Sequence, residues 1–209
     1  MRRNLSIYFF CFLGQFLSSQ INNSYDINVE LISENQTLIV NQKMRYTNTS
    51  GSILERIYLE DWSNSYSDDR SKLAKRISDE YSRSFLFSKK KQRGSTNIIQ
   101  IDSRNIKGWK RLDDIDIIEL VLLEPLEISE SIEININYSI KIPDSKFTGY
   151  GFDNQNFYLK NWLIVFSDLN NSKWSKQSNL NLNDQTIDYS DFIIKFKLNK
   201  DLKVFSNLE

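Results

Sequence analysis

The chain has 209 residues, 27 basic and 27 acidic side chains, no histidine and a single cysteine, Cys11. Without histidine it can form no Ser-His-Asp triad, Cys-His pair or H-E-x-x-H zinc helix, and its six glycines form neither of the common phosphate-binding loop motifs. The balanced charge argues against non-specific binding of nucleic acid. Composition therefore argues against an independent enzyme and against a nucleic-acid partner.

The first 20 residues have the character of a removable export signal. Two arginines precede an apolar run from Leu5 to Leu17, and two serines follow it. The run is short for a bilayer span, and Cys11 lies inside it behind bulky aromatic residues, which does not suit a lipid-attachment site. We expect a signal peptide over residues 1–20, with a buried N-terminal strand as the alternative. One domain should then cover residues 21–209, exported to periplasm, cell surface or medium, with no membrane span after signal removal.

Alternation of apolar and polar residues predicts most of the remaining chain as strands. The longest run of this kind ends at Pro143, which cannot donate to a strand ladder. The expected strands are Tyr25–Leu31, Leu38–Tyr46, one through Ile57 and Leu59, Asn97–Ile101, Ile115–Leu123, Ile132–Ile142, Phe157–Phe166 and Phe192–Leu198. So many short strands predict an all-β sandwich, whose stability must come from its core because the mature chain has no cysteine.

One segment has a helical period. Leu73, Ile77, Tyr81 and Phe85 recur every four residues with charged residues between them, after a start signal at Ser67-Asp68-Asp69. We expect one amphipathic helix inserted between strands. The basic run over residues 89–94 that follows is interpreted as a solvated loop beyond the helix, with contact to an anionic partner as the alternative.

Three groups of residues could carry chemistry, and each has a structural explanation. Four carboxylates could serve acid-base or metal chemistry, but we expect a solvated strand start: Asp113, Asp114, Asp116 and Glu119. Four oxygen-bearing side chains could bind calcium, but an asparagine-rich turn explains them: Asn179, Asn181, Asn183 and Asp184. Five aromatics could form a carbohydrate-binding face, but we expect them to fill the core or close its ends: Trp62, Trp109, Tyr150, Trp162 and Trp174.

Several segments, in their order and spacing, resemble the N-terminal β domain of aminopeptidase N-type zinc metallopeptidases. The resemblance covers almost all of residues 25–209. It is carried by Tyr25–Leu31 and its hairpin, Tyr46–Ser50, Ile53–Leu59, Asp61–Tyr66, Leu73–Arg76, Arg93–Thr96, Glu124-Pro125-Leu126, Ile132–Tyr138, Lys141-Ile142-Pro143, Phe147–Gly151, Asn161-Trp162-Leu163 and Tyr189–Phe192. Phe166 stands where that family often has a proline.

The resemblance implies a saddle-shaped, non-catalytic β domain with one inserted helix. Such a domain packs on a downstream thermolysin-like catalytic domain, helps to wall its substrate cleft, and meets peptide substrates only through it. The family's zinc ligands and catalytic glutamate lie downstream, so zinc is expected only there, and we assign this chain no cofactor and no catalytic, cofactor-binding or metal residue. None of Gln155, Gln177 and Gln185 aligns with the glutamine that the family places near the substrate amine.

A second reading is a free-standing exported β-sandwich that binds a glycan or a protein partner. The chain ends at Glu209, soon after its last expected strand. We therefore expect a fragment or a truncated gene product, which favours the metallopeptidase-domain reading.

Overall fold

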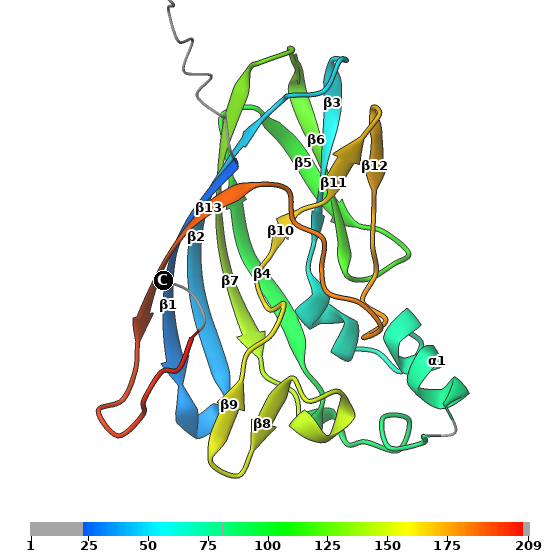
Figure 1. The fold of residues 1–209 in the computed structure, drawn as a ribbon, viewed down its shortest axis with the longest axis vertical. Helices are drawn as coiled ribbons and strands as arrows, with labels where there is room; N and C mark the ends of the chain where they lie inside the picture. Colours follow the sequence, from blue (N-terminus) through cyan, green and yellow to red (C-terminus); the bar gives the residue numbers. More distant parts are fainter. Residues whose placement is uncertain (1–22, 81, 207–209) are drawn as a thin grey trace, which may run out of the picture.

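The computed structural model describes residues 23–80 and 82–206, which form two main β-sheets, two small hairpins and one α-helix (Figure 1). The expected signal peptide lies outside the described residues. Four short 3-10 helices connect the strands within the described part of the chain: η1 (Ser33–Asn35), η2 (Trp62–Tyr66), η3 (Lys90–Gln92) and η4 (Ser145–Phe147). The all-β fold class with one inserted helix is confirmed.

The larger sheet has five strands in the order β13-β1-β2-β7-β4. Their bounds are β1 (Asn23–Ile32), β2 (Thr37–Thr47), β4 (Ser95–Asp102), β7 (Ser131–Lys141) and β13 (Ser190–Lys197). β1 and β2 form the expected hairpin, whose turn places Gln36 in the left-handed region at φ 54°. The edge strand β13 pairs in parallel with β1, so the end of the described chain returns to its beginning.

The smaller sheet has four strands in the order β10-β3-β6-β5. Their bounds are β3 (Leu54–Glu60), β5 (Ile106–Arg111), β6 (Ile117–Leu126) and β10 (Val165–Phe166). Two hairpins complete the strands: β8 (Gly151–Asp153) with β9 (Asn156–Tyr158), and β11 (Asp168–Asn170) with β12 (Lys173–Ser175). In Figure 1 the smaller sheet lies at the upper right, and the larger sheet runs down the left side of the molecule.

The core forms between the two sheets because each strand turns its apolar positions to the same side. Ile27, Leu38 and Ile134 are fully buried on the inner face of the larger sheet, and Ile57 and Leu120 are fully buried in the smaller sheet. The core contains one internal polar pair. The Tyr138 hydroxyl donates to Gln42 Oε1 at 2.5 Å, and Gln42 Nε2 donates to the Ile164 carbonyl at 2.5 Å.

Two sequence expectations about the strands and the helix are wrong in their extent. Phe157–Phe166 is not one strand, because β9 ends at Tyr158 and β10 begins only at Val165. Instead, residues 159–164 form an irregular stretch in which Trp162 and Ile164 are buried, Lys160 is exposed, and the Ile164 carbonyl accepts from Gln42. An apolar run predicts burial, but it does not by itself predict a regular strand.

The α-helix, α1 (Lys72–Asp79), is shorter than expected and begins later. Its N-cap is Ser71, whose hydroxyl accepts from the Ala74 backbone at 3.1 Å, so Ser67 does not start it. Phe85 lies beyond the helix end but is fully buried, because its ring packs edge-on against Tyr66 and Phe147. Tyr81 lies outside the described residues. Among the described residues, no helix has the length and apolarity needed to span a bilayer.

Candidate functional site

The main concentration of buried polar side chains lies where β3 ends and η2 begins. Glu60 and Asp61 stand side by side in the sequence there, and both are at most 1% exposed. The Asp61 backbone donates to the Asp116 carbonyl at 2.8 Å, which brings a third buried carboxylate, from the turn before β6, into the same region. Buried carboxylates need partners, so their hydrogen bonds define what this region does.

Asp61 joins the two sheets. One carboxylate oxygen accepts from Thr96 on β4 at 2.7 Å, and the other forms an ion pair of 2.7 Å with Arg111 on β5. The neighbouring Asn64 also receives the Thr96 backbone N–H, at 3.1 Å. A strand of the larger sheet and a strand of the smaller sheet are thus held by one buried carboxylate.

Glu60 and Asp116 hold the segment of residues 176–185 against the sandwich. Glu60 accepts from the Gln177 backbone at 3.0 Å and from the Gln185 side chain at 3.4 Å. Asp116 accepts from the Ser178 hydroxyl at 2.8 Å and from the Asn179 backbone at 2.7 Å. Glu60 at the end of β3 and Asp116 in the turn before β6 therefore anchor a segment that has no strand or helix of its own.

Burial shifts the proton affinity of both anchoring carboxylates. Desolvation raises the pKa of Glu60 to about 7, against the hydrogen bonds from Gln177 and Gln185 that lower it. Desolvation likewise raises the pKa of Asp116 to about 6, against the hydrogen bonds from Asn179 and Ser178. The proton occupancy of this anchor therefore changes near neutral pH.

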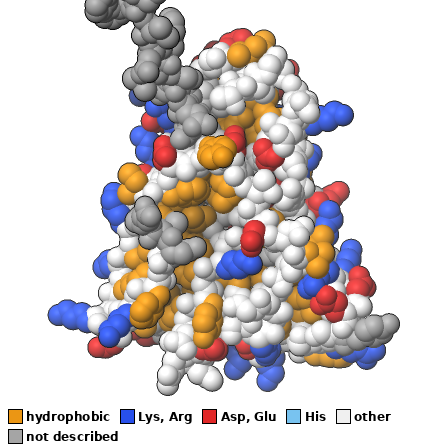
Figure 2. All heavy atoms as spheres, viewed as in Figure 1, with side chains coloured by type: hydrophobic (Ala, Val, Ile, Leu, Met, Phe, Trp, Pro, Cys, Tyr) orange, Lys and Arg blue, Asp and Glu red, His pale blue; other side chains and the backbone are white. Residues whose placement is uncertain are grey.

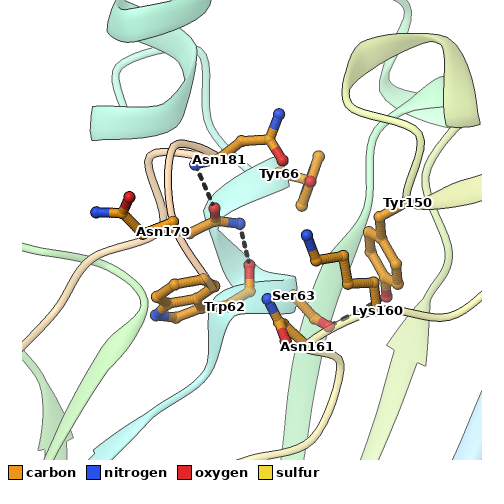
Figure 3. Close-up of a pocket in the computed structure, with 9 residues that line it drawn as sticks. Trp62, Ser63, Tyr66, Tyr150, Lys160, Asn161, Asn179 and Asn181 are labelled. Carbon is orange, nitrogen blue, oxygen red and sulfur yellow. Dashed lines mark hydrogen bonds between the residues drawn. The ribbon is translucent and has the colours of Figure 1, made fainter. Parts of the chain in front are cut away.

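A small pocket lies beside the anchored segment (Figure 3). Trp62, Ser63 and Tyr150 form one side, and the Ser63 and Tyr150 hydroxyls lie 3.1 Å apart. The Asn179 amide donates to the Trp62 carbonyl at 3.4 Å on the other side. The cavity volume is about 20 Å³, enough for a single water, and no carboxylate lines it. This pocket cannot hold a sugar or a peptide side chain.

The acidic candidates from the sequence do not form one cluster. Asp116 and Glu119 are buried, which contradicts the expected solvated strand start. The reason is that β6 begins only at Ile117, so Asp116 lies in the turn before the strand, where residues 178 and 179 cover it. Asp114 instead pairs with Lys72 of α1 at 2.8 Å. Among the described residues, no group of three or more acidic, histidine or cysteine side chains could hold a metal ion.

Glu119 belongs to a different contact, on the smaller sheet. Its carboxylate accepts from the Tyr58 hydroxyl at 2.8 Å and lies 3.2 Å from Lys110 and 3.5 Å from Arg56. Burial raises its pKa, but these hydrogen bonds and positive charges outweigh burial and hold the pKa below its ordinary value. Glu119 is therefore a paired structural carboxylate.

The asparagine and aromatic candidates have mainly structural positions. Asn179 is buried and caps the local turn, since its Oδ1 accepts from the Asn181 backbone at 2.9 Å. Trp62, Tyr150 and Trp162 are buried, as the core interpretation predicts, whereas Trp109 remains 41% exposed. The Trp62 indole N–H donates to the Gln177 carbonyl at 2.7 Å, which adds to the anchoring of residues 176–185.

Comparisons with known proteins found similarity to solved structures only. No protein-family model and no curated protein matches the chain. One similar solved structure is an M1 zinc metallopeptidase mutant from Deinococcus radiodurans bound to a Tyr-Ser-Ala substrate, with 12% identity over 59% of this chain and 21% of that chain, and a TM-score of 0.35. Another is a two-domain M1 zinc metallopeptidase mutant bound to L-arginine, with 12% identity over 87% of this chain and 34% of that chain, and a TM-score of 0.46. The chain thus matches about a fifth to a third of the length of these structures.

Proposed function

We propose that this chain is a non-catalytic β domain of an exported zinc aminopeptidase-like metallopeptidase. In this proposal it packs on a thermolysin-like catalytic domain and helps to wall the cleft in which that domain binds peptides. The resemblance of its ordered sequence segments supports the proposal, as does a chain without histidine and with its only cysteine in the expected signal peptide. Catalysis and zinc would belong entirely to the catalytic domain.

The observation that carries the proposal is an apolar strip on the edge of the larger sheet. Phe192, Ile194 and Phe196 point from β13 to the inner face, because they stand in register with the inward residues of β1. We call these three residues the β13 strip. Phe192 and Ile194 are half-buried and Phe196 is 37% exposed, whereas the paired residues on β1 are buried.

The strip is incompletely covered because the smaller sheet does not reach across to β13. In Figure 1 β13 runs from near β10 toward the lower left edge of the molecule, and Figure 2 shows hydrophobic side chains on the left part of the surface. Phe192 and Ile194 pack against the core on one side, and two of the strip residues form aromatic contacts. Phe192 stacks on Tyr25 with ring centroids 4.5 Å apart, and Phe196 meets Trp162 at 5.8 Å. An apolar strip on an edge strand is the kind of surface that an adjoining domain covers.

The apolar run Trp162–Phe166 and the loop at Tyr150 do not provide such a surface. Tyr150, Trp162, Ile164 and Phe166 are all buried within this domain, so they have no apolar face left for a partner to cover.

Dye binding and self-association of the mature chain test the proposal. We expect the chain to bind a hydrophobic dye and to self-associate, and Phe196→Ser to reduce both. Ile39→Ser is the matched control, since Ile39 is 43% exposed on the opposite face of the same sheet. A monomeric chain that binds no dye, or equal effects of the two substitutions, would favour a free-standing binding module instead.

A further inference from the structure

A second surface, formed by the segment between α1 and β4, combines positive charge with protruding apolar side chains. Residues 82–101 contain five basic residues and no acidic one. Lys89, Lys90 and Lys91 are exposed, and none of them forms an ion pair with a described residue. A block of unpaired cations attracts anionic surfaces.

Two apolar side chains project into solvent immediately before these lysines. Phe87 is 74% exposed and Leu86 is 47% exposed. We call Leu86, Phe87 and the three lysines the basic tip. The core at this place is already filled by the neighbouring Phe85, which is fully buried against Tyr66 and Phe147. The exposure of Leu86 and Phe87 therefore leaves no gap in the core. The chain anchors one ring in the core and presents the next one outward.

Arg93 stabilises the conformation of the basic tip through three contacts. Its guanidinium forms an ion pair of 3.3 Å with Asp69, donates to the Ser88 hydroxyl at 2.9 Å, and lies 5.1 Å from the centre of the Phe85 ring. The Ser88 backbone also donates to the Phe85 carbonyl at 3.0 Å, which closes the turn. The exposed groups therefore sit on a held turn.

Acidic groups around the tip are already matched by cations. Asp69 pairs with Arg93, and Glu80 pairs with Arg76. Asp144, which accepts from the Gln92 side chain at 3.4 Å, pairs with Lys146 at 2.9 Å. The three lysines of the tip therefore keep their charge for a partner outside the described chain.

We propose that the basic tip docks on the surface of an anionic lipid bilayer. Leu86 and Phe87 enter the boundary between headgroups and acyl chains, while the three lysines contact lipid phosphates. A bilayer suits this surface because α1 and the segment after it project from the sandwich in Figure 1, and a fluid interface accepts a convex apolar projection without a preformed pocket. A nucleic-acid partner fits less well, since the tip has a single exposed aromatic ring for base stacking.

This docking is compatible with the proposed domain contact and does not depend on it. Figure 1 shows β13 at the left edge of the molecule and α1 at the lower right. The two surfaces can therefore be occupied at the same time.

Vesicle cosedimentation tests the proposal, with 70:30 phosphatidylcholine:phosphatidylglycerol vesicles compared with pure phosphatidylcholine vesicles. It should use the full chain and, in parallel, the chain from Ile21, because the apolar run at residues 5–17 can itself bind lipid. We expect binding to the anionic vesicles that falls with added salt. Lys89→Gln, Lys90→Gln and Lys91→Gln together should lower the binding constant about a hundred-fold. Each lysine near an anionic surface raises that constant about five-fold. Leu86→Ser with Phe87→Ser should weaken binding at least about ten-fold.

Matched controls separate the tip from general charge and apolarity. Lys173→Gln, Lys200→Gln and Lys203→Gln remove the same charge from exposed positions elsewhere, and Ile53→Ser with Leu123→Ser remove comparable exposed apolar surface. Both control variants should bind as the parent chain does. Equal losses in control and tip variants would overturn the proposal. A second result would also overturn it: vesicle binding that depends on the lysines but not on Leu86 and Phe87, together with equal affinity for single-stranded DNA. That result would indicate a general site for polyanions.

Discussion

The Asp61 carboxylate is fully buried and lies 2.7 Å from the Arg111 guanidinium, whose side chain remains 22% exposed. The same carboxylate accepts from Thr96 on the other sheet. This pair links the two sheets beside Glu60, the carboxylate that holds Gln177 of the anchored segment.

Removing the cation of this pair should be strongly destabilising. Arg111→Met leaves the Asp61 charge buried without its ionic partner, and we expect a loss of about 3 kcal/mol in the free energy of unfolding. Lys43→Met is the control, because Lys43 forms an exposed ion pair of 3.0 Å with Glu133. This substitution should lower the free energy of unfolding by no more than about 0.5 kcal/mol. Urea denaturation measures both, and similar losses would show that Asp61 does not depend on Arg111.

The Glu60 carboxyl should make stability fall as pH rises toward neutrality. Its pKa is raised to about 7 in the folded chain from an ordinary value of 4.5, so the folded state holds the proton more tightly than the unfolded state. Its stabilising contribution is fully present below pH 4.5 and is lost as pH rises through 7. Glu60→Gln removes this titration.

The measurement is the stability difference between Glu60→Gln and the parent chain at several pH values between 4.5 and 8. The variant should gain stability relative to the parent as pH rises. Glu133→Gln, on an exposed carboxylate, should show no such trend. A constant difference for Glu60→Gln across this range would contradict the raised pKa.

Gly151 should not tolerate a side chain. Its φ is +140°, and a Cβ there would clash with the Pro143 carbonyl oxygen and would lie 2.7 Å from the Ser145 backbone nitrogen. We expect Gly151→Ala to cost more than about 2 kcal/mol of stability. Gly51→Ala, where a Cβ meets nothing within 4 Å, should be nearly neutral in the same thermal or urea unfolding assay. Equal stability of the two variants would contradict the close approach at Pro143.

The chain from Ile21 should neither bind zinc tightly nor hydrolyse aminoacyl amides. This part of the sequence contains no histidine and no cysteine, so its side chains offer mainly oxygen ligands, which favour calcium or magnesium over zinc. The check is metal analysis after dialysis against zinc, together with an aminoacyl amide assay of the same sample. Zinc bound at one ion per chain, or zinc-dependent hydrolysis, would contradict this prediction.

Period-two patterns predicted the strands that have one buried and one exposed face. β1, β2, β7 and β13 lie close to their expected positions, because on these strands alternation reports burial directly. Alternation failed for residues 159–164, and the four-residue helical period failed for Phe85, because in both places apolar side chains are buried from an irregular backbone. Local spacing predicts burial, but it does not distinguish a regular element from an irregular segment packed against the core.

The polar anchor could be predicted only in part. Glu60 and Asp61 follow an apolar strand, but nothing local says that Asp61 meets Thr96 and Arg111, which are 35 and 50 residues away in the sequence. The prediction that Asp116 faces solvent was wrong, because its burial depends on the segment of residues 176–185 folding over it. Likewise, the basic run was visible in the sequence, whereas the outward position of Phe87 beside the buried Phe85 required the fold.

The central claim, that this chain packs on a catalytic domain through the β13 strip, is tested most directly by binding. The partner to test is a domain that contains an H-E-x-x-H helix, sought downstream in the same gene and expressed as a separate polypeptide. Calorimetry should show a one-to-one complex that Phe196→Ser weakens at least about ten-fold, as expected for loss of a buried aromatic anchor, and that Ile39→Ser leaves unchanged. The absence of such a coding sequence, no binding, or equal effects of the two substitutions would contradict the claim.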